Sequence, residues 1–234
     1  MCGRYTAAPT RADEISDRLG VSLDEKVVSL VTDRYNVAPR QEIAVVRETD
    51  GERAVRVARW GLLPRWAKTS RDRLQPINAR SDKVLDSKMW RPLMDNSAKR
   101  VLIPATGWYE WLHAERRRGE RPAPFHHVVD DGALFAFAGL MNTTRVDDMD
   151  DPITTAAIIV TDANGPASRL HDRMPVVLAD PETMAAWVSA DLDADDAAEL
   201  LVPLADDRVT LHAASRLANS VRNSGPELLD PSND

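Results

Sequence analysis

The feature of this sequence that most constrains its fold is a series of short apolar segments separated by turn signals. Most of the segments alternate apolar and polar side chains, and Thr49-Asp50-Gly51 and Asp130-Asp131-Gly132 each lie between two of them. Such alternation is typical of β-strands, and Asp-Gly is a hairpin signal. We expect hairpins at both turns and a central position for the most apolar segment, 154–160. The expected strands are 43–47, 54–59, 100–104, 107–112, 125–129, 134–137, 154–160, 176–178 and 209–212.

Helical patterns are fewer and shorter than strand patterns. The sequence predicts helices over 10–20, most of 81–94, 181–188 and 195–201. The stretch 34–39 is expected to be irregular, and 115–121 to form a charged turn. Many short strands with a few helices indicate a single α+β domain built on antiparallel sheet.

Length and composition agree with a soluble domain. The chain has 234 residues, of which 43% are hydrophobic and 29% charged, which is enough for a sizeable core. No apolar run approaches the roughly 20 residues that a membrane helix needs. The N-terminus has no signal-peptide core. We therefore expect a cytoplasmic protein without membrane contact.

The only cysteine, Cys2, directly follows the initiator methionine. A single cysteine excludes internal disulfides and any multi-cysteine zinc site. A small residue at position 2 permits removal of Met1, which would leave Cys2 with a free α-amine next to its thiol. Such an aminothiol can attack an acyl carbon through sulfur, or condense with an aldehyde and close a thiazolidine ring. The alternative is that Cys2 is an incidental small residue at a frayed terminus.

Charge is distributed unevenly along the chain. The net charge is −7, yet residues 34–100 hold 16 basic and 8 acidic residues and carry a net +8. A basic centre in an acidic chain suits local anion binding. Within it, four arginines of the first hairpin are expected to be solvated strand faces rather than ligands: Arg47, Arg53, Arg56 and Arg59.

Five of the six tryptophans fall within residues 60–111, which overlap the basic region. Tryptophans among arginines resemble a single-strand nucleic-acid surface, on which bases stack and guanidinium groups hold phosphates. We expect Trp60, Trp90 and Trp108 to be core residues. Trp66, on a basic loop, is the first stacking candidate, and Trp111 the second.

Three polar residues stand out as candidates for chemistry. Glu110 lies in an aromatic strand, where burial would raise its pKa towards the range useful for proton transfer. His171 precedes a basic turn stiffened by proline, and Asn78 lies in a predicted loop beside the basic region. Each has an ordinary alternative, such as a salt bridge for Glu110. The five histidines lack metal-ligand spacing, and we expect no metal and no cofactor.

An ordered set of motifs connects these residues. The set closely resembles the SOS response-associated peptidase family of abasic-site processing proteins, over about residues 2–229. Asp82 and Val101 depart from the family pattern, but neither has a proposed catalytic role. The motifs are Met1-Cys2-Gly3-Arg4-Tyr5, Arg34-Tyr35-Asn36-Val37-Ala38-Pro39, Trp60-Gly61-Leu62-Leu63-Pro64, Asn78-Ala79-Arg80, Leu102-Ile103-Pro104-Ala105, Gly107-Trp108-Tyr109-Glu110-Trp111, His171-Asp172-Arg173-Met174-Pro175 and Asn219-Ser220-Val221-Arg222-Asn223.

The resemblance implies a fold and a set of site residues. We expect one domain over 1–229 with a barrel-like core, and a loose tail at 230–234. Cys2 would be the nucleophile that crosslinks to abasic sites in single-stranded DNA, with Asn78, Glu110 and His171 completing the site. Positions near the DNA path would be Arg4, Pro39, Trp66, Arg80, Lys88, Trp111 and Arg173.

The resemblance also implies activities and a location. The family is described as a peptidase that removes its own N-terminal residue, and lyase activity would accompany crosslinking if an imine eliminates before the thiol closes. We expect a monomer that associates with the nucleoid when it binds DNA. Two alternatives stay open: an amidohydrolase with an N-terminal cysteine nucleophile, and a non-enzymatic reader of modified or single-stranded DNA.

Overall fold

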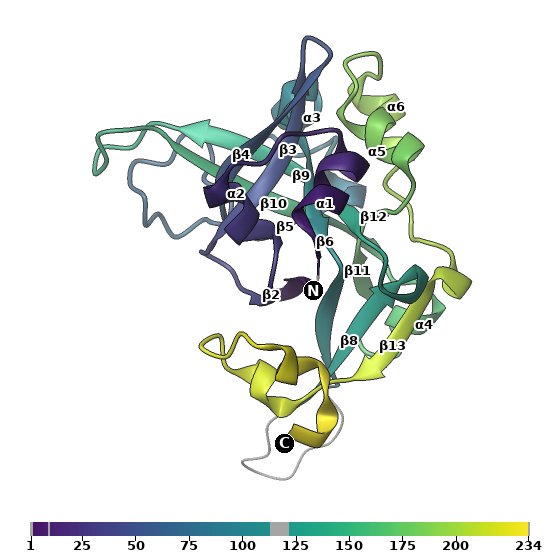
Figure 1. The fold of residues 1–234 in the computed structure, drawn as a ribbon. Helices are drawn as coiled ribbons and strands as arrows, with labels where there is room; N and C mark the ends of the chain where they lie inside the picture. The colour runs from purple at the N-terminus through teal and green to yellow at the C-terminus, as the bar shows by residue number, and fades with distance from the viewer. Residues whose placement is uncertain (1, 9, 113–121, 234) are drawn as a thin grey trace.

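A computed structural model describes residues 2–8, 10–112 and 122–233, and Figure 1 shows its fold. Met1 and the charged turn expected at 115–121 lie outside the described residues. Two sheets make up the β-structure, joined by strands that follow one another closely in sequence. Among the described helices, none is both long enough and apolar enough to cross a membrane.

The larger sheet closes on itself. Five of its strands form a ring in which β10 pairs with β4, β4 with β3, β3 with β6, β6 with β9, and β9 again with β10. The expected barrel-like core is therefore confirmed, although β4 and β5 pair with β10 in parallel. The strands are β3 (Glu42–Thr49), β4 (Glu52–Trp60), β5 (Asn78–Arg80), β6 (Arg100–Ala105), β9 (Phe135–Thr144), β10 (Ile153–Asp162), β11 (Arg173–Pro175) and β12 (Val177–Leu178).

The smaller sheet carries the N-terminus. Its strand order is β13-β8-β7-β1-β2, and every pairing is antiparallel. Its second strand in chain order, β2, lies at one edge, beside β1, and β1 lies between β2 and β7. The strands are β1 (Tyr5–Ala7), β2 (Arg34–Val37), β7 (Gly107–Leu112), β8 (Ala123–Val129) and β13 (Val209–Ala213).

Short helices flank the sheets. In Figure 1, α5 and α6 lie beside the barrel, and α4 lies near β13. Helix α1 ends at Gly20, whose φ of 66° is the left-handed conformation that favours glycine. The helices are α1 (Ala12–Leu19), α2 (Glu25–Val31), α3 (Arg91–Met94), α4 (Gly165–Ser168), α5 (Pro181–Val188) and α6 (Ala194–Glu199).

Two hydrophobic clusters use the two faces of the barrel strands. Alternate residues of β3 divide between them: Ala44 and Val46 pack with the helices, whereas Ile43 and Val45 pack with Trp60 and Cys2. This division is the period-two pattern in three dimensions. At the C-terminal end, Leu228 is fully buried, and a short 3-10 helix spans Pro231–Asn233.

Four expectations about local structure are wrong. Residues 34–37 form a strand, because β1 supplies a pairing partner that the sequence does not reveal. Within 81–94, a 3-10 helix spans Ser81–Lys83, turns follow, and α-helix is confined to Arg91–Met94. Asn78 begins a strand rather than lying in a loop. Residues 125–129 and 134–137 do not pair, because the turn at Asp130–Gly132 carries the chain from the smaller sheet to the barrel.

Candidate active site

The N-terminal segment places Cys2 inside the protein. Tyr5 pairs with Trp108 of β7, and the Tyr109 N–H donates to the Arg4 carbonyl at 2.9 Å. An antiparallel strand that continues in this register brings the residues before Arg4 alongside Glu110. The Cys2 side chain is fully buried among the apolar residues that include Tyr5, and its Sγ lies 3.9 Å from the Arg4 carbonyl.

The Glu110 carboxylate acts electrostatically on the Cys2 thiol. Burial raises the pKa of the Cys2 thiol, and the nearby Glu110 carboxylate raises it further. Burial likewise raises the pKa of Glu110, which is 5% exposed. Both shifts favour the protonated, neutral forms. Glu110 is thus a buried carboxyl within an aromatic strand, and its charge acts on the proposed nucleophile.

Asn78 lies at the start of β5, opposite Ile158 of β10. Its position is fixed by Trp60, whose Nε1 donates to the carbonyl of the preceding residue, Ile77, at 2.9 Å. Both polar atoms of the Asn78 amide are buried, and neither has a hydrogen-bond partner among the described residues. Buried polar atoms are nearly always satisfied, so an exception calls for an explanation. An amide with an unused donor and acceptor is suited to holding a ligand.

His171 lies on the other side of β10. The loop that carries it leads into β11, whose Arg173 pairs with Asp162. Its Nδ1 accepts the Arg173 N–H at 3.0 Å and lies 2.7 Å from the Asp172 carboxylate. The neutral ring can accept from Arg173, whereas the protonated ring is drawn to Asp172. His171 Nδ1 thus lies within reach of both the Arg173 N–H and the Asp172 carboxylate.

The arginines on both sides of β10 share a group of carboxylates. Arg80 forms two hydrogen bonds with Asp82, at 2.9 and 2.7 Å. Arg173 lies 2.8 Å from Asp162 and 3.9 Å from Asp82. The Arg80 pair is exposed to solvent, where ion pairs contribute little. A phosphate can replace such a carboxylate at small cost.

Arg4 and Trp111 contact the C-terminal segment. Arg4 donates to Asn36 Oδ1 at 2.7 Å and to the Ala218 carbonyl at 2.9 Å, and its guanidinium lies 5.5 Å from the centre of the Trp111 ring. Trp111 Nε1 donates to Asn219 Oδ1 at 2.7 Å. The last of the sequence motifs, residues 219–223, is called the closing motif. These contacts show a structural role that sequence analysis missed, since they hold the segment around this motif against Arg4 and Trp111.

The other candidates lie at the surface. Trp66 is 52% exposed, and together with Lys88 it lines a hollow of about 180 Å³ whose floor includes Leu62, Met89 and Leu93. Pro39 is half-buried in the turn after β2. Trp60, Trp90 and Trp108 are buried, as expected. The structure thus separates buried tryptophans from an exposed one.

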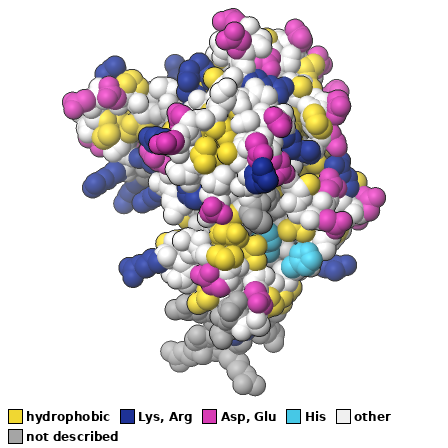
Figure 2. All heavy atoms as spheres, viewed as in Figure 1, with side chains coloured by type: hydrophobic (Ala, Val, Ile, Leu, Met, Phe, Trp, Pro, Cys, Tyr) yellow, Lys and Arg dark blue, Asp and Glu magenta, His cyan; other side chains and the backbone are white. Residues whose placement is uncertain are grey.

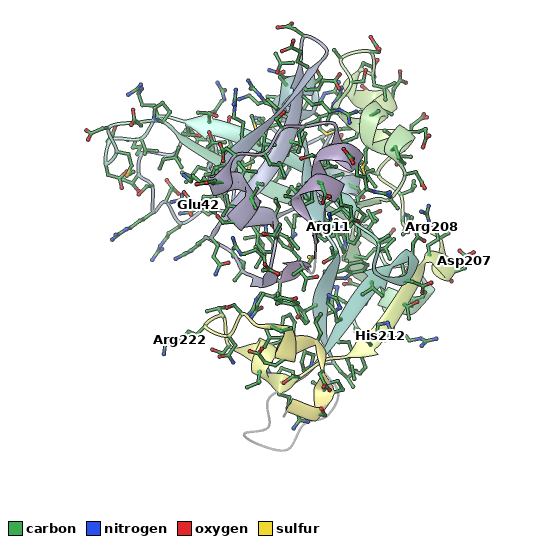
Figure 3. All side chains as sticks on the ribbon, in the orientation of Figure 1. Arg11, Glu42, Asp207, Arg208, His212 and Arg222 are labelled. Carbon is green, nitrogen blue, oxygen red and sulfur yellow. The ribbon has the colours of Figure 1, made fainter. Side chains whose placement is uncertain are left out.

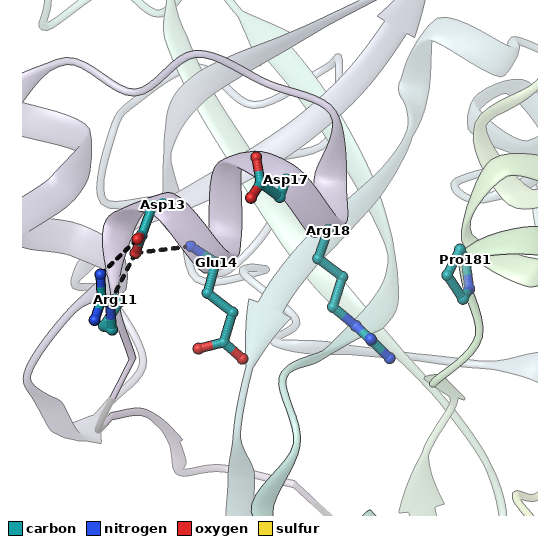
Figure 4. A pocket seen from close by; sticks show the side chains of 6 residues that line it. All are labelled: Arg11, Asp13, Glu14, Asp17, Arg18 and Pro181. Carbon is teal, nitrogen blue, oxygen red and sulfur yellow. Dashed lines mark hydrogen bonds and ion pairs between the residues drawn. The ribbon is translucent and has the colours of Figure 1, made fainter.

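A hollow larger than the one at Trp66 lies elsewhere. It has a volume of about 570 Å³ and lies between α1 and the start of α5 (Figure 4). Its lining includes Arg11 and Asp13, which form an ion pair. It also includes Arg18, whose side chain extends towards Pro181. None of its residues is a candidate for the chemistry, so the size of a hollow does not identify the candidate site.

Sequence analysis also missed Gly107. A side chain there would lie 2.3 Å from His126 Nε2 and 2.5 Å from the His127 carbonyl. The close approach lets His126 bond the Thr6 hydroxyl at 2.9 Å, which joins β8 to β1. A glycine inside a strand pattern was the available signal, since such glycines often mark close packing.

Several known proteins with similar sequences are named as abasic site processing proteins. The chain is 33% identical to "Abasic site processing protein YoqW" of Bacillus subtilis, over 98% of this chain and 99% of that protein. It is 27% identical to "Abasic site processing protein YedK" of Escherichia coli, over 99% and 100%. It is 30% identical to "Abasic site processing protein HMCES" of Gallus gallus, over 77% of this chain and 58% of that protein.

Solved structures support the fold. A protein from Bacteroides thetaiotaomicron superposes with a TM-score of 0.84 at 24% identity, over 98% of this chain and 99% of that one. A protein from Bordetella bronchiseptica superposes with a TM-score of 0.72 at 23% identity, over 92% and 100%. The sequence model described as "SOS response associated peptidase (SRAP)" matches residues 1–221. With the relatives above, that match shows that this chain belongs to the SOS response associated peptidase family.

Proposed function

We propose that this protein processes abasic sites in single-stranded DNA by forming a covalent crosslink through Cys2. Family membership and the names of the relatives support abasic sites as the substrate. The observation that carries the proposal for the chemistry is the burial of the Cys2 thiol, whose pKa the nearby Glu110 carboxylate also raises. Removal of Met1 places the reacting amine on Cys2 itself.

The first step joins nitrogen to carbon. An abasic deoxyribose opens to an aldehyde at C1′, and the Cys2 amine adds to that carbon. The resulting carbinolamine loses one water and becomes an imine. Glu110, with its raised pKa, supplies the proton that the departing hydroxyl needs. His171 assists ring opening at the sugar oxygen, and the Asn78 amide holds the N-terminal residue by hydrogen bonds.

The second step joins sulfur to the same carbon. The thiol adds to the imine, its proton passes to the nitrogen, and a five-membered thiazolidine closes. Because burial raises the thiol pKa, sulfur is protonated while the amine reacts, so the order amine first and thiol second suits the site. Glu110, now deprotonated, relays the thiol proton to the nitrogen. The crosslink as a whole releases one water.

Two further activities belong to this proposal. An imine that eliminates before sulfur closes cleaves the strand on the 3′ side, which is lyase activity. Cleavage of the Met1-Cys2 bond by the chain itself would be the peptidase activity that the family description names. In both cases the reacting groups are those of Cys2 and Glu110.

The test is a denaturing gel with single-stranded DNA that carries one abasic site. We expect a band that survives heating without reductant, and an intact mass equal to protein without Met1 plus DNA minus one water. The control is the same strand with a tetrahydrofuran abasic analogue, which has no aldehyde. Glutaminase activity without any adduct would point to the amidohydrolase, and reversible binding alone to the reader.

A further inference from the structure

A third hollow is lined by charged side chains that are all cationic. It has a volume of about 260 Å³ and lies between the end of β4, the turn after β2 and the loop that follows Trp66. Its lining is Arg40, Arg59, Ser70, Arg71 and Gln75. None of the three arginines forms an ion pair with a carboxylate of the described residues. Asp148 acts electrostatically on Arg59 and Arg71. Three guanidinium groups near one carboxylate still leave a net positive charge around the hollow, which attracts an anion.

Arg59 forms the inner wall of this hollow, and the expectation that it is a solvated strand residue is wrong. Its Nη2 donates to the Ser70 carbonyl at 2.9 Å and to Gln75 Oε1 at 3.4 Å. Its Nε is buried and has no hydrogen-bond partner in the described part of the chain. Burial lowers the Arg59 pKa, and the neighbouring Arg40 lowers it further. Arg56, on the same strand, is exposed and fits the expectation.

Arg40 is held in an unfavourable backbone conformation. Its φ is 72°, the left-handed region in which glycine is favoured and arginine is not. The Arg40 N–H donates to the Trp60 carbonyl at 2.8 Å, which fixes the turn against the end of β4. Strain of this kind is typical of functional positions. Arg40 also directly follows Pro39, a position that the family resemblance assigns to the DNA path.

The third wall is a loop that is held in place by a neighbouring one. Asp148 accepts from the Ser70 N–H at 2.7 Å and from the Ser70 hydroxyl at 2.8 Å. The Asp147 N–H donates to the Lys68 carbonyl at 2.8 Å. These bonds orient the Ser70 carbonyl that Arg59 contacts. Asp148 is thereby hydrogen-bonded to Ser70, and its carboxylate also acts electrostatically on Arg59 and Arg71.

Negative charge begins beside the hollow. An adjoining hollow shares Arg40, Arg59 and Ser70 but is also lined by Glu42 and Asp151. Figure 3 locates Glu42 at the side of the barrel near β4, and Figure 2 shows Lys and Arg side chains gathered on that side of the molecule. Because Glu42 and Asp151 repel negative charge in the adjoining hollow, an anion is favoured in the hollow that the three arginines line.

We propose that Arg40, Arg59 and Arg71 bind one backbone phosphate of the DNA strand that carries the abasic site. Guanidinium groups match the oxygens of a phosphate in planar, paired hydrogen bonds, and the unused Arg59 Nε–H can complete such a pair. The inference rests on the proposed function for the identity of the strand. It adds a phosphate subsite whose three arginines are not among the seven positions that the family resemblance assigns to the DNA path.

The test replaces single phosphates by neutral methylphosphonates, one position at a time. The probe is a single strand with a central tetrahydrofuran abasic analogue, so that binding stays reversible. We expect one position at which the substitution weakens binding by about tenfold, the size of one charge-assisted hydrogen bond. In a double variant Arg40→Gly/Arg71→Ala, that position should no longer matter, while the other sensitive positions keep their effect.

The variants separate a binding role from a structural one. Arg40→Gly suits the backbone at φ 72°, so its melting temperature should equal or exceed that of the wild type while its affinity falls. Arg56→Ala removes one charge from the same strand and is the matched control. The double variant should flatten the dependence of log K on log salt by about 0.7 for the one phosphate that it no longer neutralises, and Arg56→Ala should not.

Two results would overturn the proposal. The first is a double variant that responds to every methylphosphonate as the wild type does. The second combines two observations. Inorganic phosphate raises the melting temperature of the wild type but not that of the double variant, and no methylphosphonate weakens DNA binding. The site would then take a free anion instead of a DNA phosphate. Failure of the proposed function is distinct, since it would appear as absence of a crosslink to the true abasic strand.

Discussion

The candidate site has a buried part and an exposed part. Cys2 and Glu110 are buried, whereas an exposed group of side chains, called the rim here, consists of Trp66, Arg80 and Lys88. In the interior, burial raises the pKa of both the thiol and the carboxyl. On the rim, the pKa of Arg80 is raised by a hydrogen bond with Asp82, and its charge is permanent. We therefore expect substitutions in the interior to change the reaction rate and substitutions on the rim to change DNA affinity.

The largest effect is expected for Glu110→Gln. Glutamine keeps the shape of the side chain but cannot cycle a proton, and a positioned general acid or base contributes about 10²–10⁴-fold. Crosslink formation and reversal should both slow by that factor, with little change in affinity for a tetrahydrofuran strand. Single-turnover gels and fluorescence anisotropy measure the two quantities. A variant that crosslinks at the wild-type rate would remove Glu110 from the mechanism.

The same variant should change the pH dependence of stability. Because the folded pKa of Glu110 lies above the unfolded value of about 4.5, the unfolded chain loses its proton first as pH rises. The contribution of Glu110 to stability is therefore full below that value and is lost as pH rises through the folded pKa. Denaturant unfolding at several pH values should show this decline in the wild type and not in Glu110→Gln.

Trp66→Ala should weaken binding without slowing the reaction of bound DNA. Loss of a stacked base costs roughly 1–3 kcal/mol, at every salt concentration. Leu74→Ala is the matched control, because Leu74 is 47% exposed on the same loop. Anisotropy titrations at two salt concentrations measure the effect. Equal reductions in both variants would mean that the loop responds to any truncation rather than to removal of a stacking surface.

Asn78→Leu tests whether the unused amide serves the reaction. An apolar side chain of similar shape removes two unsatisfied buried atoms, so unfolding free energy should stay level or rise by about 1 kcal/mol. Crosslinking should nevertheless slow by about tenfold, the value of one hydrogen bond to a charged group. Thermal unfolding and single-turnover rates give the two readings. A variant that is both stable and fully active would show that the amide has no role.

The smallest effect is expected for Arg80→Ala. Release of one phosphate contact should flatten the slope of log K against log salt by about 0.7 or less. Arg91→Ala is the control, since Arg91 is likewise an exposed arginine held by carboxylates, Asp95 and Asp195. Affinity titrations over a salt series measure the slopes. If the two variants flatten the slope equally, the effect is that of net charge and not of a contact.

Much of the site could be read from the sequence because its signals are local. A cysteine at position 2, a glutamate among aromatics and a tryptophan on a basic loop need no tertiary information. Burial of Glu110 and exposure of Trp66 follow from alternation and from Pro64, and both are confirmed. The hairpin of β3 and β4 is also confirmed, since its turn lies within the sequence window.

The failures arise where distant segments decide the outcome. Residues 34–37 become a strand because β1 lies beside them, and the turn at 130–132 joins two sheets rather than two paired strands. Arg59 alternates like a solvated residue, yet the loop at Ser70 covers it. Docking of the closing motif on Arg4 and Asn36 joins residues more than 180 positions apart. No local pattern encodes such contacts.

The central claim is that both halves of Cys2 take part, and Cys2→Ala separates them. Alanine still permits removal of Met1 and keeps the α-amine, so an imine with the abasic aldehyde can form, but no ring can close. On denaturing gels with abasic single-stranded DNA, the wild type should give an adduct that survives heat without reductant. Cys2→Ala should give an adduct only when borohydride is present, together with strand cleavage. A heat-stable adduct from Cys2→Ala without reductant would contradict the thiazolidine.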